Sequence, residues 1–162
     1  MNKVVVLIFL SVFLAAQNAT IEFLETRYIE ALNEKVTKKG EVEFGANHTL
    51  IRYLPPNQRE ITLKNGIVTL QTKDSIVQKS AKEEQNIVYM FTVFKAAFDN
   101  NETELKKFFK ITKDDTDTVL TPFSTSSPVS KMTFSRSREK IKKIEIFSWD
   151  DSRITIDVVE KK

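Results

Sequence analysis

The sequence contains no cysteine, three glycines and one histidine among its 162 residues. Without cysteine the chain forms no disulfide, binds no zinc through thiolates, and has neither a thiol nucleophile nor a sulfur for lipid attachment. Gly40, Gly45 and Gly66 are too few and too far apart for either common glycine-rich phosphate-binding motif. His48 would have to serve every histidine-dependent triad or metal site. These absences argue against nucleotide and thiol chemistry and favour binding over catalysis, with no metal and no cofactor.

The charge and length of the chain limit its class further. Lys and Arg number 25 against 22 Asp and Glu, a formal net charge of +3, and 41% of the residues are hydrophobic. Such a composition is typical of a folded globular domain, and the length fits one domain plus a targeting segment. A chain this close to neutral gives no electrostatic reason to expect nucleic acid as a partner.

The first nineteen residues have the pattern of a secretory signal peptide. Lys3 precedes an apolar run from Val4 to Ala16 that only Ser11 interrupts. As a helix this run would extend about 20 Å, less than the roughly 30 Å hydrocarbon core of a bilayer, which disfavours a permanent anchor. We predict cleavage after Ala16 or Ala19, a single domain over residues 20–162, and localisation in a bacterial periplasm.

The start of the predicted domain has apolar side chains at helical spacing. Intervals of three and four residues separate Ile21, Leu24, Tyr28 and Leu32. This spacing predicts an amphipathic helix that ends at about Asn33.

Short segments rich in β-branched and aromatic residues, separated by turn residues, fill most of the rest. Asn65-Gly66 is a strong signal for a two-residue hairpin, because both central residues of that turn need positive φ. Strands are predicted at Glu41 to Phe44, Thr49 to Leu54, Arg59 to Lys64, Ile67 to Thr72, Ser75 to about Lys82, Phe108 to Lys113, Thr118 to Pro122, Val129 to Ser135, Ile141 to Trp149 and Arg153 to Val159.

One segment between these strands returns to helical spacing and is unusually apolar. Ile87, Phe91, Phe94 and Phe98 follow one another at helical intervals, with Met90 beside them. Such a helix is either an ordinary core helix or the lid of an apolar cavity, and its spacing does not distinguish the two. A further helical turn is expected after it, over residues 102–107.

The order of elements predicts an α+β fold. One highly curved antiparallel sheet, a half-closed β-barrel, would bury its concave apolar face beneath the helices. The inward side chains of the strands would line a cavity or fill a solid core, since both obey the same alternation. The predicted inward set is Leu50, Ile61, Leu63, Val68, Leu70, Phe134, Ile144, Ile146, Ile154 and Ile156.

Several short motifs occur in the order found in one known family. They are Arg52-Tyr53 followed by Pro55-Pro56, the turn Lys64-Asn65-Gly66, the segment Leu105-Lys-Lys-Phe-Phe-Lys-Ile with the polar turn Asp114 to Asp117, and Val119-Leu-Thr-Pro122. In these motifs the chain resembles the outer-membrane lipoprotein carrier family, the LolA-like proteins of the bacterial periplasm. The resemblance also implies that Tyr28 to Val36 form a strand after a shorter helix.

The resemblance implies a non-enzymatic, monomeric periplasmic carrier. Such a carrier shields the acyl chains of lipoproteins in an apolar cavity and takes them from the inner to the outer membrane. Its partners would be a lipoprotein-releasing ABC transporter and an outer-membrane receptor. Two alternatives stay open: a carrier of another lipid-like cargo on the same fold, and a ligand-free periplasmic interaction domain.

The sequence departs from the family at one functional motif. The family usually carries an Arg-Pro pair, implicated in holding the lid closed, where this chain reads Gly45-Ala-Asn-His48. Arg52 is the remaining candidate for a lid contact. In the basic late hairpin, Arg136, Arg138 and Lys142 are candidates for a face that docks on an acidic receptor or anionic headgroups, the alternative being a solvated surface.

Overall fold

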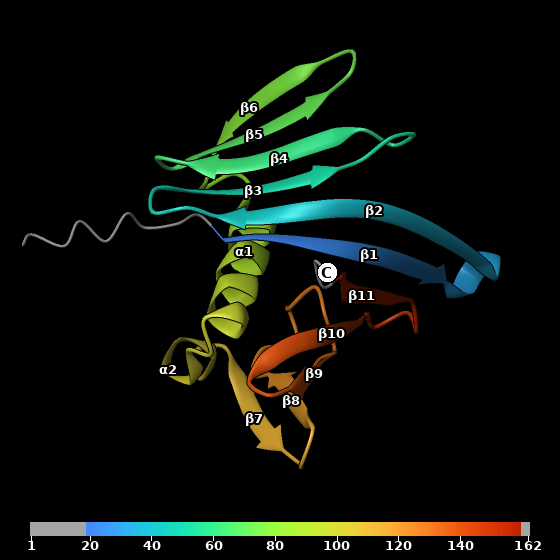
Figure 1. Cartoon of the computed structure of the whole chain (residues 1–162), viewed down its shortest axis with the longest axis vertical. Coiled ribbons are helices and arrows are strands. Elements are labelled where there is room, and N and C mark those ends of the chain that lie inside the picture. Colours follow the sequence, from blue (N-terminus) through green and yellow to red (C-terminus); the bar gives the residue numbers. More distant parts are fainter. Residues whose placement is uncertain (1–18, 160–162) are drawn as a thin grey trace, which may run out of the picture.

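The computed structural model describes residues 19–159, which form one eleven-stranded antiparallel sheet and two helices (Figure 1). The strand order is β6-β5-β4-β3-β2-β1-β11-β10-β9-β8-β7, so β6 and β7 are open edges. Helix α1 lies against the concave face (Figure 1). The predicted α+β fold with a curved, half-closed sheet is confirmed. The predicted signal peptide lies outside the described residues except for Ala19.

The elements have the following bounds. The strands are β1 (Ala19–Ile29), β2 (Glu34–Phe44), β3 (His48–Tyr53), β4 (Arg59–Lys64), β5 (Ile67–Thr72), β6 (Ile76–Ser80), β7 (Phe109–Lys113), β8 (Asp117–Pro122), β9 (Lys131–Ser137), β10 (Lys140–Phe147) and β11 (Arg153–Val159). The helices are α1 (Gln85–Phe98) and α2 (Glu102–Leu105), and a single 3-10 turn covers Glu30–Leu32.

The helix predicted at the start of the domain is wrong. This segment is β1, which pairs with β2 on one side and β11 on the other. The strand predicted for Tyr28 to Val36 is wrong as well, because the 3-10 turn and Asn33 in the left-handed region (φ 49°) divide it between two strands. Backbone pairing on both sides outweighs helical spacing, and Leu32, assigned to the apolar face, is 62% exposed.

The other predicted strands are confirmed within two residues at each end, except that β2 begins seven residues before the predicted Glu41. The hairpin between β4 and β5 turns at Asn65 (φ 51°) and Gly66 (φ 75°), as its sequence predicts. Helix α1 also forms where predicted, beginning two residues before Ile87.

Two separate apolar cores lie on the concave side of the sheet, and α1 contributes to both. In the larger core, Val93, Ala96 and Ala97 of α1 pack with β7 to β10 and Leu105 of α2. In the smaller core, Phe91 packs with the inner side chains of β1, β2 and β3. Between the two cores the helix bridges a region that is not filled.

A glycine in β2 allows two aromatic rings to pack closely in the smaller core. Gly40 pairs with Phe23 of β1 and Tyr53 of β3, whose ring centroids are 5.9 Å apart in an edge-to-face contact. A Cβ atom at Gly40 would lie 2.6 Å from Cζ of Phe23 and 2.7 Å from the carbonyl oxygen of Arg52. The ring therefore occupies the space of a missing side chain.

We expect Gly40→Ala to lower the free energy of unfolding by about 1–3 kcal/mol, because the added methyl group overpacks against backbone. Urea unfolding measures this change. Lys39→Ala is the matched control, since the Lys39 side chain is exposed on the same strand. Equal stability of the two variants would contradict this packing.

Candidate ligand cavity

A cavity of about 370 Å³ lies between the concave face of the sheet and α1. This volume is within the range of protein sites for small ligands. Its walls are formed by Ile21, Phe23, Glu25 and Arg27 of β1, Val42 of β2, Ile51 and Tyr53 of β3, Arg59 and Ile61 of β4, Asn86, Ile87, Met90, Phe91, Phe94 and Phe98 of α1, Pro128 and Val129 before β9, Ile144 and Ile146 of β10, Ser148 after it, and Ile154 and Ile156 of β11.

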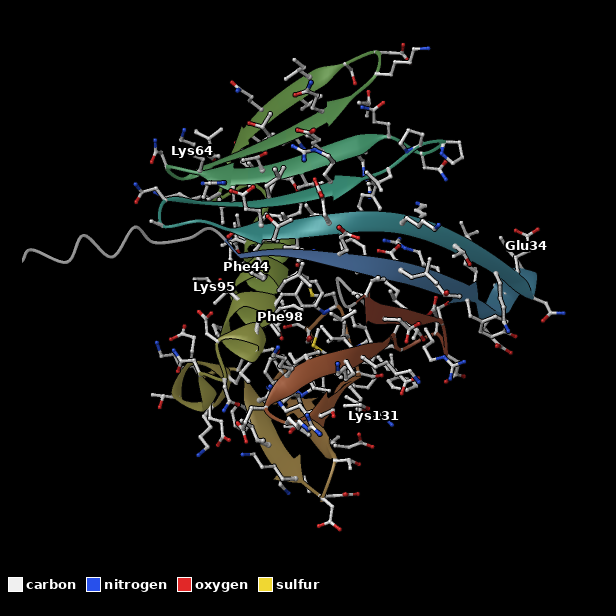
Figure 2. The ribbon with its side chains drawn as sticks, in the orientation of Figure 1. Glu34, Phe44, Lys64, Lys95, Phe98 and Lys131 are labelled. Atoms are coloured by element: carbon white, nitrogen blue, oxygen red, sulfur yellow. The ribbon has the colours of Figure 1, made fainter. Side chains whose placement is uncertain are left out.

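Helix α1 turns one apolar side to the cavity. All five side chains singled out by their spacing lie on its wall: Ile87, Met90, Phe91, Phe94 and Phe98. The small side chains of Ala96 and Ala97 face the larger core instead, so the helix is in part an ordinary core helix and in part a cavity wall. At one end Phe98 packs on Phe44 of β2 with ring centroids 5.5 Å apart, and Lys95 approaches the Phe44 ring at 5.8 Å (Figure 2).

The predicted inward strand residues fall into three groups. Ile61, Ile144, Ile146, Ile154 and Ile156 lie on the cavity wall. Phe134 is fully buried in the larger core, and Leu63 packs against the smaller one. Val68 and Leu70 of β5 pair with Leu63 and Ile61 of β4, so they lie on the same face of the sheet but are not part of the cavity wall. The alternation of apolar residues along the strands therefore predicts which side chains face inward, whereas the position of α1 decides which of them line the cavity.

The prediction for Leu50 is wrong. Strand β3 alternates so that Thr49, Ile51 and Tyr53 are buried, which places Leu50 on the convex face. Leu50 and Ile51 are adjacent apolar residues, and a shift of one residue exchanges the two faces of a strand. The sequence alone gave no means to choose between them.

The prediction of a lid contact for Arg52 is also wrong. Arg52 lies on the convex face and forms ion pairs with Glu41 of β2 and Glu60 of β4, the latter at 2.6 Å. These carboxylates lie opposite Arg52 on the two neighbouring strands. The three charges stabilise the outside of the sheet, away from α1.

The predicted docking face is divided by the structure. Arg136 turns toward α1, where Nη2 donates to the carbonyl oxygen of Ala97 at 3.0 Å, so its assignment to an outward docking face is wrong. The guanidinium thus satisfies a carbonyl at the end of the helix. Arg138 is exposed in the turn between β9 and β10, and Lys142 is half-buried in β10. For these two, docking stays a prediction.

A group of polar side chains that the sequence did not single out lies at one part of the cavity wall. Glu25 is only 3% exposed and accepts hydrogen bonds from the Tyr53 hydroxyl and from Nε of Arg27, both at 2.6 Å. The Arg59 guanidinium lies 4.9 Å from the centroid of the Tyr53 ring. We call Glu25, Arg27, Tyr53 and Arg59 the polar cluster. Alternation along β1 would have revealed it only if that segment had been recognised as a strand.

The polar cluster is electrostatically coupled. Burial, together with the charge of Glu25 and the hydrogen bond to it, raises the pKa of Tyr53 to about 12. Burial alone would lower the pKa of Arg27, but the hydrogen bond and charge of Glu25 outweigh it and the pKa is raised. Tyr53 is therefore a neutral donor at physiological pH and Arg27 is a cation.

Features of other function classes do not converge on the cavity. His48 contacts Glu43 at 3.0 Å on the convex face. Across residues 19–159, the structure brings together no group of His, Asp and Glu side chains suited to a metal ion. In the same part of the chain, no helix is both long and apolar enough to cross a membrane.

Several solved structures are similar to this chain. A LolA superfamily protein from Nitrosomonas europaea is 8% identical, with a TM-score of 0.49 over 88% of this chain and 84% of that chain. The lipoprotein LppX from Mycobacterium tuberculosis is 8% identical, with a TM-score of 0.47 over 89% and 86% of the two chains. An outer membrane lipoprotein-sorting protein domain from Vibrio parahaemolyticus is 8% identical, with a TM-score of 0.40 over 88% and 83%.

The likeness concerns the fold alone. All three structures have TM-scores below 0.5 and 8% sequence identity to this chain. No protein-family model matches the sequence, and no curated protein matches it either. What the cavity does has to be argued from its own residues.

The raised pKa of Tyr53 predicts a pH dependence of stability. An unfolded tyrosine ionises near pH 10, so the folded state is favoured below pH 10 and loses this advantage as the pH rises toward about 12. Two pKa units correspond to about 3 kcal/mol. We expect the free energy of unfolding, measured by circular dichroism, to decrease over this pH range. The last tyrosine ionisation, measured by ultraviolet absorbance, should occur over the same range.

Tyr53→Phe is expected to be less stable than the wild type at neutral pH, because one oxygen of Glu25 loses its donor. This difference should shrink between pH 10 and pH 12. Tyr28→Phe is the control, since Tyr28 lies outside the polar cluster and its hydroxyl bonds to Asn33 near the surface. A stability difference between Tyr53→Phe and wild type that stays constant through this range would contradict the assignment.

Proposed function

We propose that this protein is a non-enzymatic carrier that shields acyl chains in the cavity between α1 and the concave face of the sheet. The observation that carries the proposal is the cavity itself, an unfilled space of about 370 Å³ walled largely by isoleucine, phenylalanine and methionine. A ligand-free interaction domain would have closed this space with side chains, because interiors pack densely and a cavity costs stability.

The energetics of an acyl chain agree with such a role. Burying one methylene group gains about 0.8 kcal/mol, so a sixteen-carbon chain exposed to water costs on the order of 10 kcal/mol. A carrier that moves such a chain between membranes must shield most of its surface from water. The aromatic and branched side chains of α1 and of strands β10 and β11 supply apolar contacts from opposite sides of the cavity.

Helix α1 is the element suited to act as the lid. Ile87 and Phe91 pack against the smaller core while Val93 and Ala97 pack against the larger one, so the helix spans the opening between the two. A longer or second chain would need more room than the present cavity offers. Movement of the helix away from the smaller core would provide it, and part of the binding energy would be spent on that opening.

The finer proposal follows the sequence resemblance to the lipoprotein carrier family. In it the cargo is a lipoprotein, received from an ABC transporter in the inner membrane and delivered to a receptor at the outer membrane. The carrier is a monomer in the periplasm, and Arg138 and Lys142 belong to the surface that meets an acidic partner. The basic character of the hairpin between β9 and β10 supports electrostatic docking of this kind.

We expect Phe94→Glu to lose acylated cargo, because a carboxylate on the cavity wall cannot be buried against hydrocarbon. Native mass spectrometry of protein isolated without detergent from its own host measures the bound mass. Lys95→Ala is the matched control: it is the next residue of α1, is exposed, and lowers the net charge by the same amount. If neither the wild type nor Lys95→Ala carried any bound acylated molecule, even after addition of a triacylated lipopeptide, the carrier function would be contradicted.

We also expect the mature protein to begin at Gln17 or Thr20. Either cleavage preserves β1 from Thr20 onward, including its pairing with both neighbouring strands. The intact mass of the protein from the periplasmic fraction of its host distinguishes the two sites. Recovery of the chain with its first sixteen residues in the membrane fraction would contradict secretion by a cleaved signal peptide.

A further inference from the structure

The polar cluster gives the cavity two chemically different ends. Along β1 the wall residues alternate from Ile21 and Phe23 to Glu25 and Arg27, so the wall changes from apolar to charged in one direction. At about 3.4 Å per residue, the six steps between Ile21 and Arg27 extend roughly 20 Å. The acyl chains of one bilayer leaflet extend about 15 Å, half the hydrocarbon core. The wall is therefore long enough for an extended acyl chain with its head at the charged end.

The apolar end is closed by aromatic rings. Phe98 of α1 contacts Phe44 of β2, and Ile21 packs with Phe44 against the smaller core. The opposite end carries Glu25, Arg27 and Arg59, the only side chains of Asp, Glu, Lys, Arg or His on the cavity wall formed by residues 19–159. An amphiphile would consequently enter the cavity with a defined orientation.

The charges at this end do not balance. Both oxygens of Glu25 already accept hydrogen bonds, one from Tyr53 and one from Arg27. Within residues 19–159, Arg59 forms no ion pair with a carboxylate and instead stacks over the Tyr53 ring. Two guanidinium groups against one carboxylate leave one positive charge in excess.

Further positive charge lies beside the polar cluster. Nζ of Lys38, the residue of β2 opposite Glu25 of β1, is 5.7 Å from the centroid of the same Tyr53 ring. A cation beside an apolar cavity has lost part of its hydration and favours an anionic partner. Guanidinium groups bind the oxygens of carboxylate and phosphate in a bidentate manner.

We propose that the cavity accepts a single-chain amphiphile with an anionic head, a carboxylate or a phosphate, that binds at Arg59 and Arg27 while the chain extends toward Ile21 and Phe98. The proposal rests on the acyl-carrier function, and as its substrate class it favours another lipid-like cargo on the same fold over a triacylated lipoprotein. Glu25 accepts hydrogen bonds from Arg27 and Tyr53, and the Arg27 cation offsets the negative charge that would otherwise repel the head.

The test compares two probes with the same sixteen-carbon chain, each below its critical micelle concentration. Hexadecyl phosphate has an anionic head, whereas hexadecylphosphocholine has a zwitterionic one. Displacement of a fluorescent acyl probe gives both dissociation constants. We expect the wild type to prefer the anionic probe about tenfold or more, as for a charge-assisted hydrogen bond at a partly buried site. If the site recognises any negatively charged oxygen group, palmitate should also bind more tightly than the zwitterionic probe.

Variants locate the preference. Arg59→Met should lower the affinity for the anionic probe until it equals the affinity for the zwitterionic one. Arg59→Lys should retain part of the preference for the anionic probe. Arg52→Met is the matched control, because it removes a guanidinium from the convex face of the neighbouring strand. The control should keep the full preference.

Three results would overturn the proposal. Equal affinity of the wild type for both probes would refute the anionic head and leave the acyl-carrier function intact, whereas binding of neither probe would refute both. Displacement of hexadecyl phosphate by millimolar inorganic phosphate would show an anion site that does not depend on the chain. Because the first comparison uses only the wild type, it does not depend on the folding of any variant.

Discussion

The pairing of β1 with β11 joins the two halves of the sheet, and the other features of the structure depend on it. Strands β2 to β6 follow β1 as successive hairpins, and β7 to β11 form a second series. Only the contact between the first and last described strands makes one sheet of the two (Figure 1). Helix α1 connects the far edges, so closing the β1–β11 pair requires the helix to cross the concave face. Such a contact between distant parts of the chain is costly in loop-closure entropy and is expected to form late in folding.

This arrangement explains how one helix can serve as both core and cavity wall. Phe109, Leu120 and Phe134 are fully buried in the larger core, which packs with the C-terminal half of α1. The smaller core is held mainly through Phe91. More of the buried side chains that pack with α1 therefore belong to the larger core, and side chains do not fill the space between the helix and strands β1 and β11.

The contents of that space are limited by opposite requirements. A carrier must bind hydrocarbon strongly enough to keep it from water and weakly enough to release it. Apolar walls meet the first requirement. In the proposed site, charged groups at one end orient the ligand and make binding sensitive to its head, and the nearly buried Glu25 accepts hydrogen bonds from Tyr53 and Arg27. A resemblance in sequence motifs suggests the general task, whereas the proposed choice of amphiphile rests on these side chains.

Local chemistry by itself determined much of this protein. Turn residues such as Asn65 and Gly66 fix hairpins because few residues tolerate positive φ, and the spacing of Ile87, Phe91 and Phe94 fixes an amphipathic helix. Tertiary structure decided the rest. Residues 19–29 form a strand because distant β11 satisfies their backbone, Ile51 rather than Leu50 faces inward because register is set by neighbouring strands, and Arg52 binds carboxylates that only strand pairing brings near. Whether inward side chains fill a core or surround a cavity depends on where the helix lies, because alternation along a strand specifies a face and not a volume.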